Sequence, residues 1–342
     1  MQSRSRSRSP LRPGVAADDQ LAPPLKPVRH FEIGDADSLQ HLQQHGYVVY
    51  RDALSQLECE KATNLVWEYL EHFGVLRNRE ETWHEWPPAV AGAGILAFGG
   101  VGQCRALWYV RTRERVLDAF AHIWKAPRQD LICSFDGCVL FRPWKENPSW
   151  KTRGSWYHVD QHPTRPEFEC VQGLVNLVPV SAATGGNVLV PGSHLKLNEL
   201  AEKYPEQVHS LSPGEDFFPI PSSEPLLKGA IMPELAQGDL LLWDSRTIHC
   251  SAPGFGGEKP GDGSGLLRMA PLICMVPRSL ATPKVLEQRR KAARNGVSTT
   301  HRPHVFQPTY EYNAAKSIDE KWLRPGPELL EERTSCELSL IG

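Results

Sequence analysis

The sequence contains no apolar run that approaches the ~20 residues needed to cross a lipid bilayer. It also has almost no net charge, since 38 Lys and Arg residues against 40 Asp and Glu residues give a formal charge of −2. That balance excludes a general attraction to nucleic acid or to anionic membranes. No internal repeat is visible. We therefore expect a globular protein with no membrane span and no nucleic-acid partner, while the oligomeric state stays open.

The eight cysteines are scattered along the chain and show no Cys-x-x-Cys spacing. This absence argues against a structural zinc cluster. The N-terminal segment lacks the apolar core of a secretory signal, and the C-terminal Leu-Ile-Gly does not match a peroxisomal address of the Ser-Lys-Leu type. We therefore expect reduced thiols in an intracellular, cytoplasmic protein, with targeting to the nucleus or an organelle by the N-terminal segment left open.

The N-terminal segment has a strongly biased composition. Residues 1–28 begin with alternating Arg and Ser and then become rich in Pro, so they carry too few apolar side chains to form a core. We predict a disordered tail here. The Arg-Ser alternation is compatible with a phosphorylation tract, a nuclear address, an organelle transit peptide or a solvated tail without a separate function.

Periodic apolar residues mark the start of the foldable chain. They predict helices over residues 37–44, 55–73 and 113–124, the second with Ser55 as its N-cap. From about residue 131 the pattern changes to short β-rich runs separated by Pro, Gly and Asn. Many short strands at this spacing predict a mainly β fold with flanking helices, a double-stranded β-helix (jelly roll) of the cupin type.

The C-terminal part is predicted to be helical again. One helix is expected over residues 283–296 and another over 317–322. The first contains the run Arg289-Arg290-Lys291, which we interpret as a solvated basic face rather than a site for an anionic substrate.

Two histidines and one aspartate form the strongest candidate for a metal site. His158 and Asp160 lie in the sequence Trp-Tyr-His-Val-Asp, and residues i and i+2 of an extended strand point to the same side. His249 lies far along the chain and must come from a separate strand. Two imidazoles and one carboxylate can hold a divalent iron on one face and leave the opposite face open. The sequence therefore predicts a metal centre at these three residues.

A family resemblance supports this interpretation. The sequences WYHVDQ, VQGLVNLVPVSAATGGNVLVPGSH and GDLLLWDSRTIHCSAP occur in this order, and an arginine follows on the next predicted strand. From about Gly46 to Pro277 the chain thereby resembles the phytanoyl-CoA dioxygenase family, non-haem iron oxygenases that use 2-oxoglutarate. The resemblance implies that His158, Asp160 and His249 are the iron ligands, in a dioxygenase domain over residues 29–310 with a C-terminal extension over 311–342.

The same resemblance implies that Arg268 binds the distal carboxylate of 2-oxoglutarate. A planar guanidinium can make two parallel hydrogen bonds to a carboxylate. The family places this arginine closer to the second histidine, whereas here a Gly/Pro-rich insert, residues 253–265, lies between them. Such an insert can loop out between two strands. Arg278 is the competing candidate, but it follows a proline and is expected to lie beyond the strand.

Four further residues are candidates for the co-substrate or substrate pocket. Ser251 lies two residues after His249 and so shares its strand face. Gln172 and Asn176 differ by four residues and are expected to face the same way, and Arg142 precedes the metal strand.

Other residues near the motifs receive structural interpretations. We expect Trp156 to pack beside the metal, and Trp243 and Asp244 to belong to the scaffold. Four histidines are not expected to be ligands: His162, His194, His301 and His304.

The resemblance implies an iron(II)- and 2-oxoglutarate-dependent dioxygenase that uses O2, hydroxylates a C–H bond of a small molecule, and releases succinate and CO2. Halogenation is disfavoured, because a carboxylate stands where a halide would bind. Two alternatives stay open. One is a cupin-type jelly-roll protein that binds zinc or nickel without oxygenase activity, since those metals are favoured by affinity. The other is a non-catalytic interaction scaffold. The sequence does not select a substrate.

Overall fold

The computed structural model describes residues 23–86, 92–212, 214–258, 265–309, 322 and 333–342. Most of the predicted tail, the tip of the 253–265 insert and nearly all of the predicted 317–322 helix lie outside this part of the chain. The tail boundary at residue 28 needs correction. Leu25–Lys26 forms strand β1, which pairs in parallel with β11 (Met232–Pro233).

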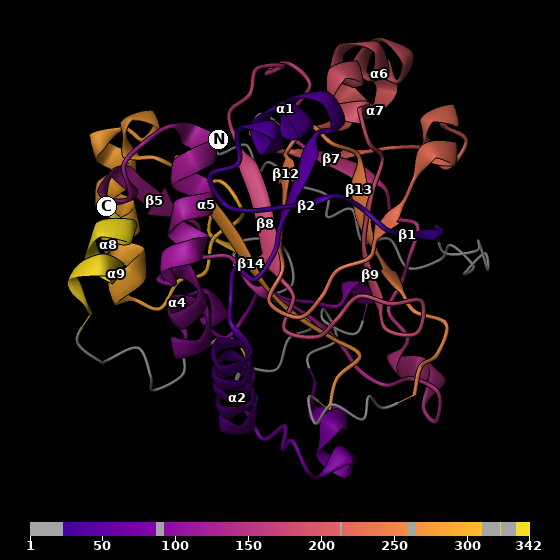
Figure 1. The fold of residues 1–342 in the computed structure, drawn as a ribbon, viewed down its shortest axis with the longest axis vertical. Coiled ribbons are helices and arrows are strands. Elements are labelled where there is room, and N and C mark those ends of the chain that lie inside the picture. Colours follow the sequence, from indigo (N-terminus) through magenta and orange to yellow (C-terminus); the bar gives the residue numbers. More distant parts are fainter. Residues whose placement is uncertain (1–22, 87–91, 213, 259–264, 310–321, 323–332) are drawn as a thin grey trace, which may run out of the picture.

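Two sheets form the centre of the molecule (Figure 1). The larger sheet has the order β2-β3-β12-β8-β14-β6-β4, with β5 also pairing with β14, and the smaller sheet has the order β10-β7-β13-β9. The strands of the larger sheet are β2 (His30–Phe31), β3 (Tyr47–Tyr50), β4 (Ile95–Leu96), β5 (Leu131–Cys133), β6 (Cys138–Phe141), β8 (Val171–Val175), β12 (Leu240–Asp244) and β14 (Arg268–Pro277). Those of the smaller sheet are β7 (His158–Asp160), β9 (Gly185–Leu189), β10 (Phe217–Pro219) and β13 (His249–Pro253).

The two sheets share one hydrophobic core. Val49, Leu174 and Ala270 from the larger sheet belong to the same buried cluster as Val159 and Val188 from the smaller sheet. Their side chains alternate with those facing the other way, as expected for strands with two distinct faces. This double-sheet arrangement is the predicted jelly roll.

Helices cover the outer face of the larger sheet, where β14 contacts both α4 and α5 (Figure 1). A second buried cluster, which includes Leu65, Leu107 and Phe120, fills the space between them. The predicted Ser55 cap is confirmed, because its side chain and that of Glu58 form a reciprocal capping box. The helices are α1 (Ala36–His45), α2 (Gln56–His72), α4 (Arg105–Arg111), α5 (Glu114–Trp124), α6 (Leu197–Lys203), α7 (Pro205–Ser210), α8 (Pro283–Arg294) and α9 (Ser335–Ile341).

One residue of the basic run of α8 departs from its interpretation, since Arg290 and Lys291 are exposed whereas Arg289 is buried. Arg289 is 1% exposed and donates hydrogen bonds to the carbonyl oxygens of Cys133, Pro303, Leu340 and Ile341. Its guanidinium therefore fastens α9 and the segment after α8 to β5, which a periodicity argument cannot reveal.

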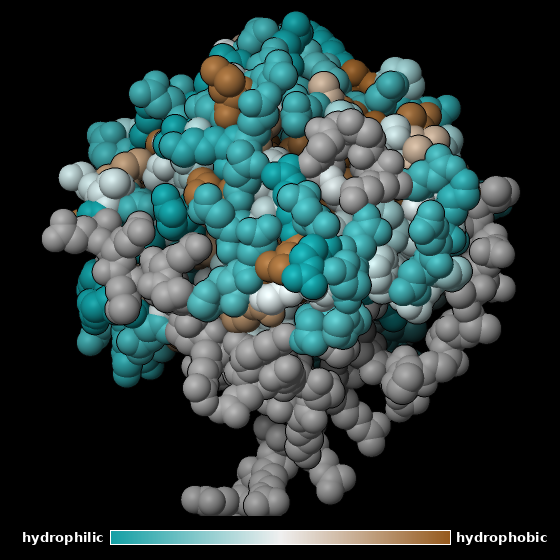
Figure 2. Space-filling model, turned by 90° about the horizontal axis from the view of Figure 1, so that it is seen from below, coloured by the Kyte–Doolittle hydropathy of each residue, from teal (hydrophilic) through white to brown (hydrophobic). Residues whose placement is uncertain are grey.

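Within the described part of the chain, no helix is both long and apolar enough to cross a membrane. The face in Figure 2 is mostly hydrophilic, with apolar residues scattered over it. The large exposed apolar side chains are Leu57, Phe168, Leu195, Phe255, Leu280 and Leu338.

Candidate metal centre

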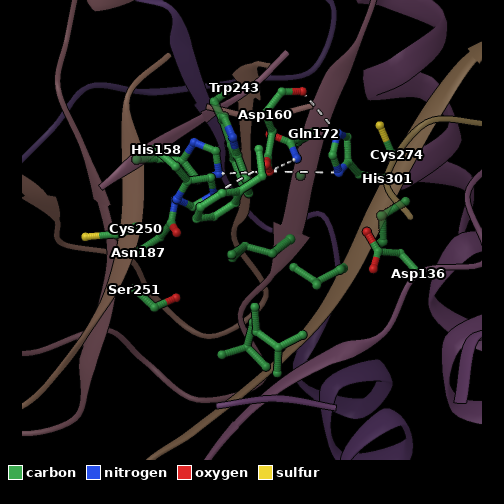
Figure 3. Close-up of a pocket in the computed structure, with 18 of the residues that line it drawn as sticks. Asp136, His158, Asp160, Gln172, Asn187, Trp243, Cys250, Ser251, Cys274 and His301 are labelled. Atoms are coloured by element: carbon green, nitrogen blue, oxygen red, sulfur yellow. Dashed lines mark hydrogen bonds and ion pairs between the residues drawn. The ribbon is translucent and has the colours of Figure 1, made fainter. Parts of the chain in front are cut away.

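The fold brings His158, Asp160 and His249 together at the centre of the smaller sheet. Figure 3 shows His158 and Asp160 of this group side by side. β7 and β13 are antiparallel, and the register places His158 directly opposite His249. The Nε2 atoms of these histidines lie 3.4 Å and 3.3 Å from the two carboxylate oxygens of Asp160. One potential ligand atom from each residue lies within 4.8 Å of the others, so a single ion can contact all three.

Backbone carbonyl groups determine which ring nitrogen of each histidine faces the centre. Nδ1 of His158 is 3.0 Å from the carbonyl oxygen of Trp156, and Nδ1 of His249 is 2.9 Å from that of Thr247. A carbonyl oxygen accepts only, so each Nδ1 carries the proton and each Nε2 keeps its lone pair. Orientation of a ligand histidine by a carbonyl is the usual arrangement at metal sites.

The charge states also suit a metal. Burial, with the neighbouring His158, lowers the pKa of His249, which keeps its imidazole neutral. Burial acts to raise the pKa of Asp160, but His158 and His301 outweigh it and hold this pKa well below its ordinary value. The site therefore presents two imidazole nitrogens and one carboxylate, a donor set that fits divalent iron.

Aromatic rings hold the two histidines in place. Trp156 stacks on His158 with ring centroids 4.8 Å apart, as expected for a residue beside the metal, and Phe217 stacks on the same ring at 4.5 Å. Trp243 packs against His249 at 5.2 Å. These contacts limit rotation of both imidazoles, so the ligand geometry is largely preformed.

The two amides expected in the pocket have different surroundings. Gln172 donates from Nε2 to Oδ2 of Asp160 at 2.8 Å and lines the cavity, so it orients the carboxylate. Asn176 follows the end of β8, is fully buried, and donates to the carbonyl oxygen of Asp239 at 3.4 Å. It is not among the residues that line the cavity.

Arg268 is a buried cation that forms no ion pair with the residues that the structure describes. It is 1% exposed, and its Nη1 lies 3.5 Å from Oγ of Ser251, while Nε and Nη2 have no hydrogen-bond partner among the described residues. Burial lowers its pKa to about 9. Ser251 lies on β13 two residues beyond His249 and lines the cavity. Buried charges are normally paired, so the guanidinium is arranged for an anion that reaches it beside Ser251.

The other two arginine candidates point elsewhere. Arg278 lies beyond the far end of β14, where Nη2 donates to the carbonyl oxygen of Ser339 at 2.6 Å. Arg142 lies between the rings of Trp86 and Trp150 and donates to the carbonyl oxygen of Trp83 at 2.9 Å. None of the three arginines is among the residues that line the cavity beside the histidines, but Arg268 alone contacts a residue that does, Ser251.

A cavity of about 220 Å³ opens beside the three candidate ligands. Apolar side chains, among them Ile95, Leu272 and Ile273, line it, and so does Asn187 of β9, which sequence reasoning did not single out. Asp136 and His301, which sequence reasoning also did not place here, line it as well (Figure 3). Burial raises the pKa of Asp136. Neither residue had a signal in the sequence, since Asp136 lies in the connection between β5 and β6 and His301 lies beyond the motifs.

The remaining predicted structural residues behave as scaffold. His194 lies 3.0 Å from the carbonyl oxygen of Gln43, and Asp244 forms an ion pair with Arg246 at 2.6 Å. Neither belongs to the metal group found among the described residues.

Comparisons with known proteins agree with this geometry. The "Ava biosynthesis cluster protein O" of Aspergillus versicolor is 29% identical over 302 residues, 85% of this chain and 92% of that protein. A "putative phytanoyl-CoA dioxygenase" of Dictyostelium discoideum is 23% identical over 251 residues, 62% of this chain and 69% of that protein. The solved structure of hypothetical protein JW0805 from Escherichia coli shares the fold, with a TM-score of 0.55 and 16% identity over 86% of this chain and 80% of that one. The family model for phytanoyl-CoA dioxygenase matches residues 42–255, and the chain belongs to the phytanoyl-CoA dioxygenase family.

Proposed function

We propose that this protein is an iron(II)- and 2-oxoglutarate-dependent oxygenase that uses O2 to hydroxylate a C–H bond of a small molecule. The observation that carries the proposal is the combination of the His-Asp-His donor set with the buried guanidinium of Arg268, whose Nε and Nη2 have no hydrogen-bond partner among the described residues. A zinc or nickel protein of the cupin type has no need for such a cation. Membership of a dioxygenase family supports the same reading.

The chain's residues divide into two groups at the proposed site. His158, Asp160 and His249 hold the iron, and Arg268 and Ser251 bind the distal carboxylate of 2-oxoglutarate. When bound, iron and 2-oxoglutarate supply the oxidising chemistry, with succinate and CO2 as products.

The surroundings of the site orient the ligands and exclude water. Gln172 holds the carboxylate of Asp160, and Trp156 and Phe217 fix the ring of His158 between them. The apolar side chains that line the cavity give the substrate a dry surface, which suits attack on an unactivated C–H bond.

The substrate is proposed to be a small molecule. The name of the A. versicolor relative places that protein in a biosynthesis cluster, which favours a biosynthetic intermediate as the substrate class here. The cavity of about 220 Å³ favours a compact reacting group at the metal end.

Succinate formation tests the proposal. Protein loaded with iron(II) under anaerobic conditions is given 2-oxoglutarate, air and a metabolite extract; succinate and extract masses that gain one oxygen atom are then measured. His158→Ala serves as the control. Absence of succinate from the iron-loaded protein, together with tight retention of zinc or nickel, contradicts the proposal and favours the cupin-type alternative.

A further inference from the structure

His301 reaches the metal centre from a part of the chain beyond the residues that match the family model. The match ends at residue 255, and His301 lies in the segment between α8 and the C-terminal helix. Its Nε2 is 3.2 Å from the backbone oxygen of Asp160, and its Nδ1 is 3.8 Å from Oδ2 of the same residue. Figure 3 shows the ring beside Asp160 and Gln172, at the edge of the cavity.

The next residue anchors this segment to the smaller sheet. Arg302 is 2% exposed, and its two terminal nitrogens lie 2.8 Å from carboxylate oxygens of Asp216 and Glu169. Asp216 directly precedes Phe217, the ring that stacks on His158. The pair with Asp216 is buried, and a buried ion pair is costly to separate, while the Glu169 side chain is 24% exposed. His301 is therefore held at the metal centre by a rigid attachment.

The hydrogen bond from His301 reaches Asp160 where the pairing between β7 and β13 is short. Asp160 is the last residue of β7, and β7 pairs with β13 only through the opposed His158 and His249. The carbonyl oxygen of Asp160 accepts the Nε2–H of His301, and the carboxylate accepts the amide of Gln172. The two donors thus restrain the backbone and the side chain of the same ligand.

We propose that His301 is a positioning residue that holds Asp160 in its metal-binding orientation. The inference rests on the proposed function for the identity of the metal. The role assigned to His301 is to donate one N–H to the Asp160 carbonyl, while its second nitrogen, too distant from Oδ2 for a hydrogen bond, faces the carboxylate and the cavity. Partners that orient metal ligands typically contribute about ten- to a hundredfold to metal affinity.

The chain offers a matched control three residues after His301. His304 lies in the same segment and approaches Arg302 at 3.4 Å, and no contact joins it to Asp160 among the described residues. His304→Ala therefore reports the effect of removing a histidine from this segment without removing the proposed hydrogen bond. His301→Gln retains an N–H donor, whereas His301→Ala retains none.

Cobalt(II) binding to the full-length chain tests the inference. Titration gives the dissociation constant, the visible absorption spectrum reports the ligand geometry, and the melting temperature without metal reports folding. We expect His301→Ala to weaken cobalt binding by about ten- to a hundredfold and to alter the spectrum. We expect His301→Gln to restore most of both, and His304→Ala to match the wild type.

Two outcomes overturn the inference. In one, His301→Ala keeps the wild-type affinity and spectrum; in the other, His304→Ala produces the same loss, which indicates general disruption of the segment. Failure of the proposed function is recognised separately, as a wild-type chain that binds cobalt but, when loaded with iron, forms no succinate from 2-oxoglutarate.

Discussion

Replacement of Arg268 by Met is predicted to have opposite effects on the free and the co-substrate-bound protein. The guanidinium is 1% exposed, and its Nε and Nη2 have no partner among the described residues. An unpaired buried charge destabilises a fold, whereas Met fills a similar volume without a charge. We therefore expect Arg268→Met, without 2-oxoglutarate, to be at least as stable as the wild type.

The bound state is expected to change in the other direction. Loss of a charge-assisted hydrogen bond costs about 1.5–3 kcal/mol, roughly ten- to a hundredfold in affinity for 2-oxoglutarate. At a concentration about a hundred times the wild-type dissociation constant, the ligand stabilises the wild type by about 2.7 kcal/mol. A hundredfold weaker variant retains about 0.4 kcal/mol. For a chain of 342 residues, we expect a ligand-induced shift in melting temperature of roughly 4 °C to fall below about 1 °C.

The assay is thermal denaturation with manganese(II), in the absence of iron and oxygen, with and without 2-oxoglutarate. Arg278→Lys is the control, because Arg278 lies beyond the other end of β14 and bonds to Ser339. A full ligand-induced shift in Arg268→Met refutes the assignment of this residue to the co-substrate. A melting temperature that falls by several degrees without ligand refutes the argument that its charge is unpaired.

Three further predictions concern the ligands, the acid stability and the N-terminus. Asp160→Ala is expected to abolish tight metal binding in an equilibrium titration and to leave the circular dichroism spectrum unchanged, because the core does not depend on this residue. Burial lowers the pKa of His304 to about 4, below its value of about 6.5 in the unfolded chain. The unfolded state therefore binds more protons between these values, so the free energy of unfolding falls as the pH drops from about 6.5 to 4. His304→Gln should remove up to about 2 kcal/mol of this loss in urea titrations at several pH values, and an unchanged pH profile would contradict the assignment. Deletion of residues 1–22 should leave melting temperature and succinate formation unchanged, since the described fold begins with β1 at Leu25; a lower melting temperature would show that the segment contributes to the fold.

The sequence by itself determined the features that depend on local geometry. The His-x-Asp spacing places two side chains on one side of any extended strand, so His158 and Asp160 were paired without knowledge of the fold. The Ser55 cap and the alternation of short β-runs with turn residues are equally local. For this reason the jelly roll and the candidate metal residues could be predicted before the strands were placed in space.

Only the tertiary structure decided how distant residues meet. The register of β7 and β13 sets His249 opposite His158, and the fold brings the start of β14 to β13, where Arg268 meets Ser251. Arg289 is buried and links neighbouring segments, although periodicity places it on a solvated face. His301 meets Asp160 because ion pairs of the next residue fix the path of a late segment. Such contacts depend on strand register and on chain paths between elements, which no local pattern encodes.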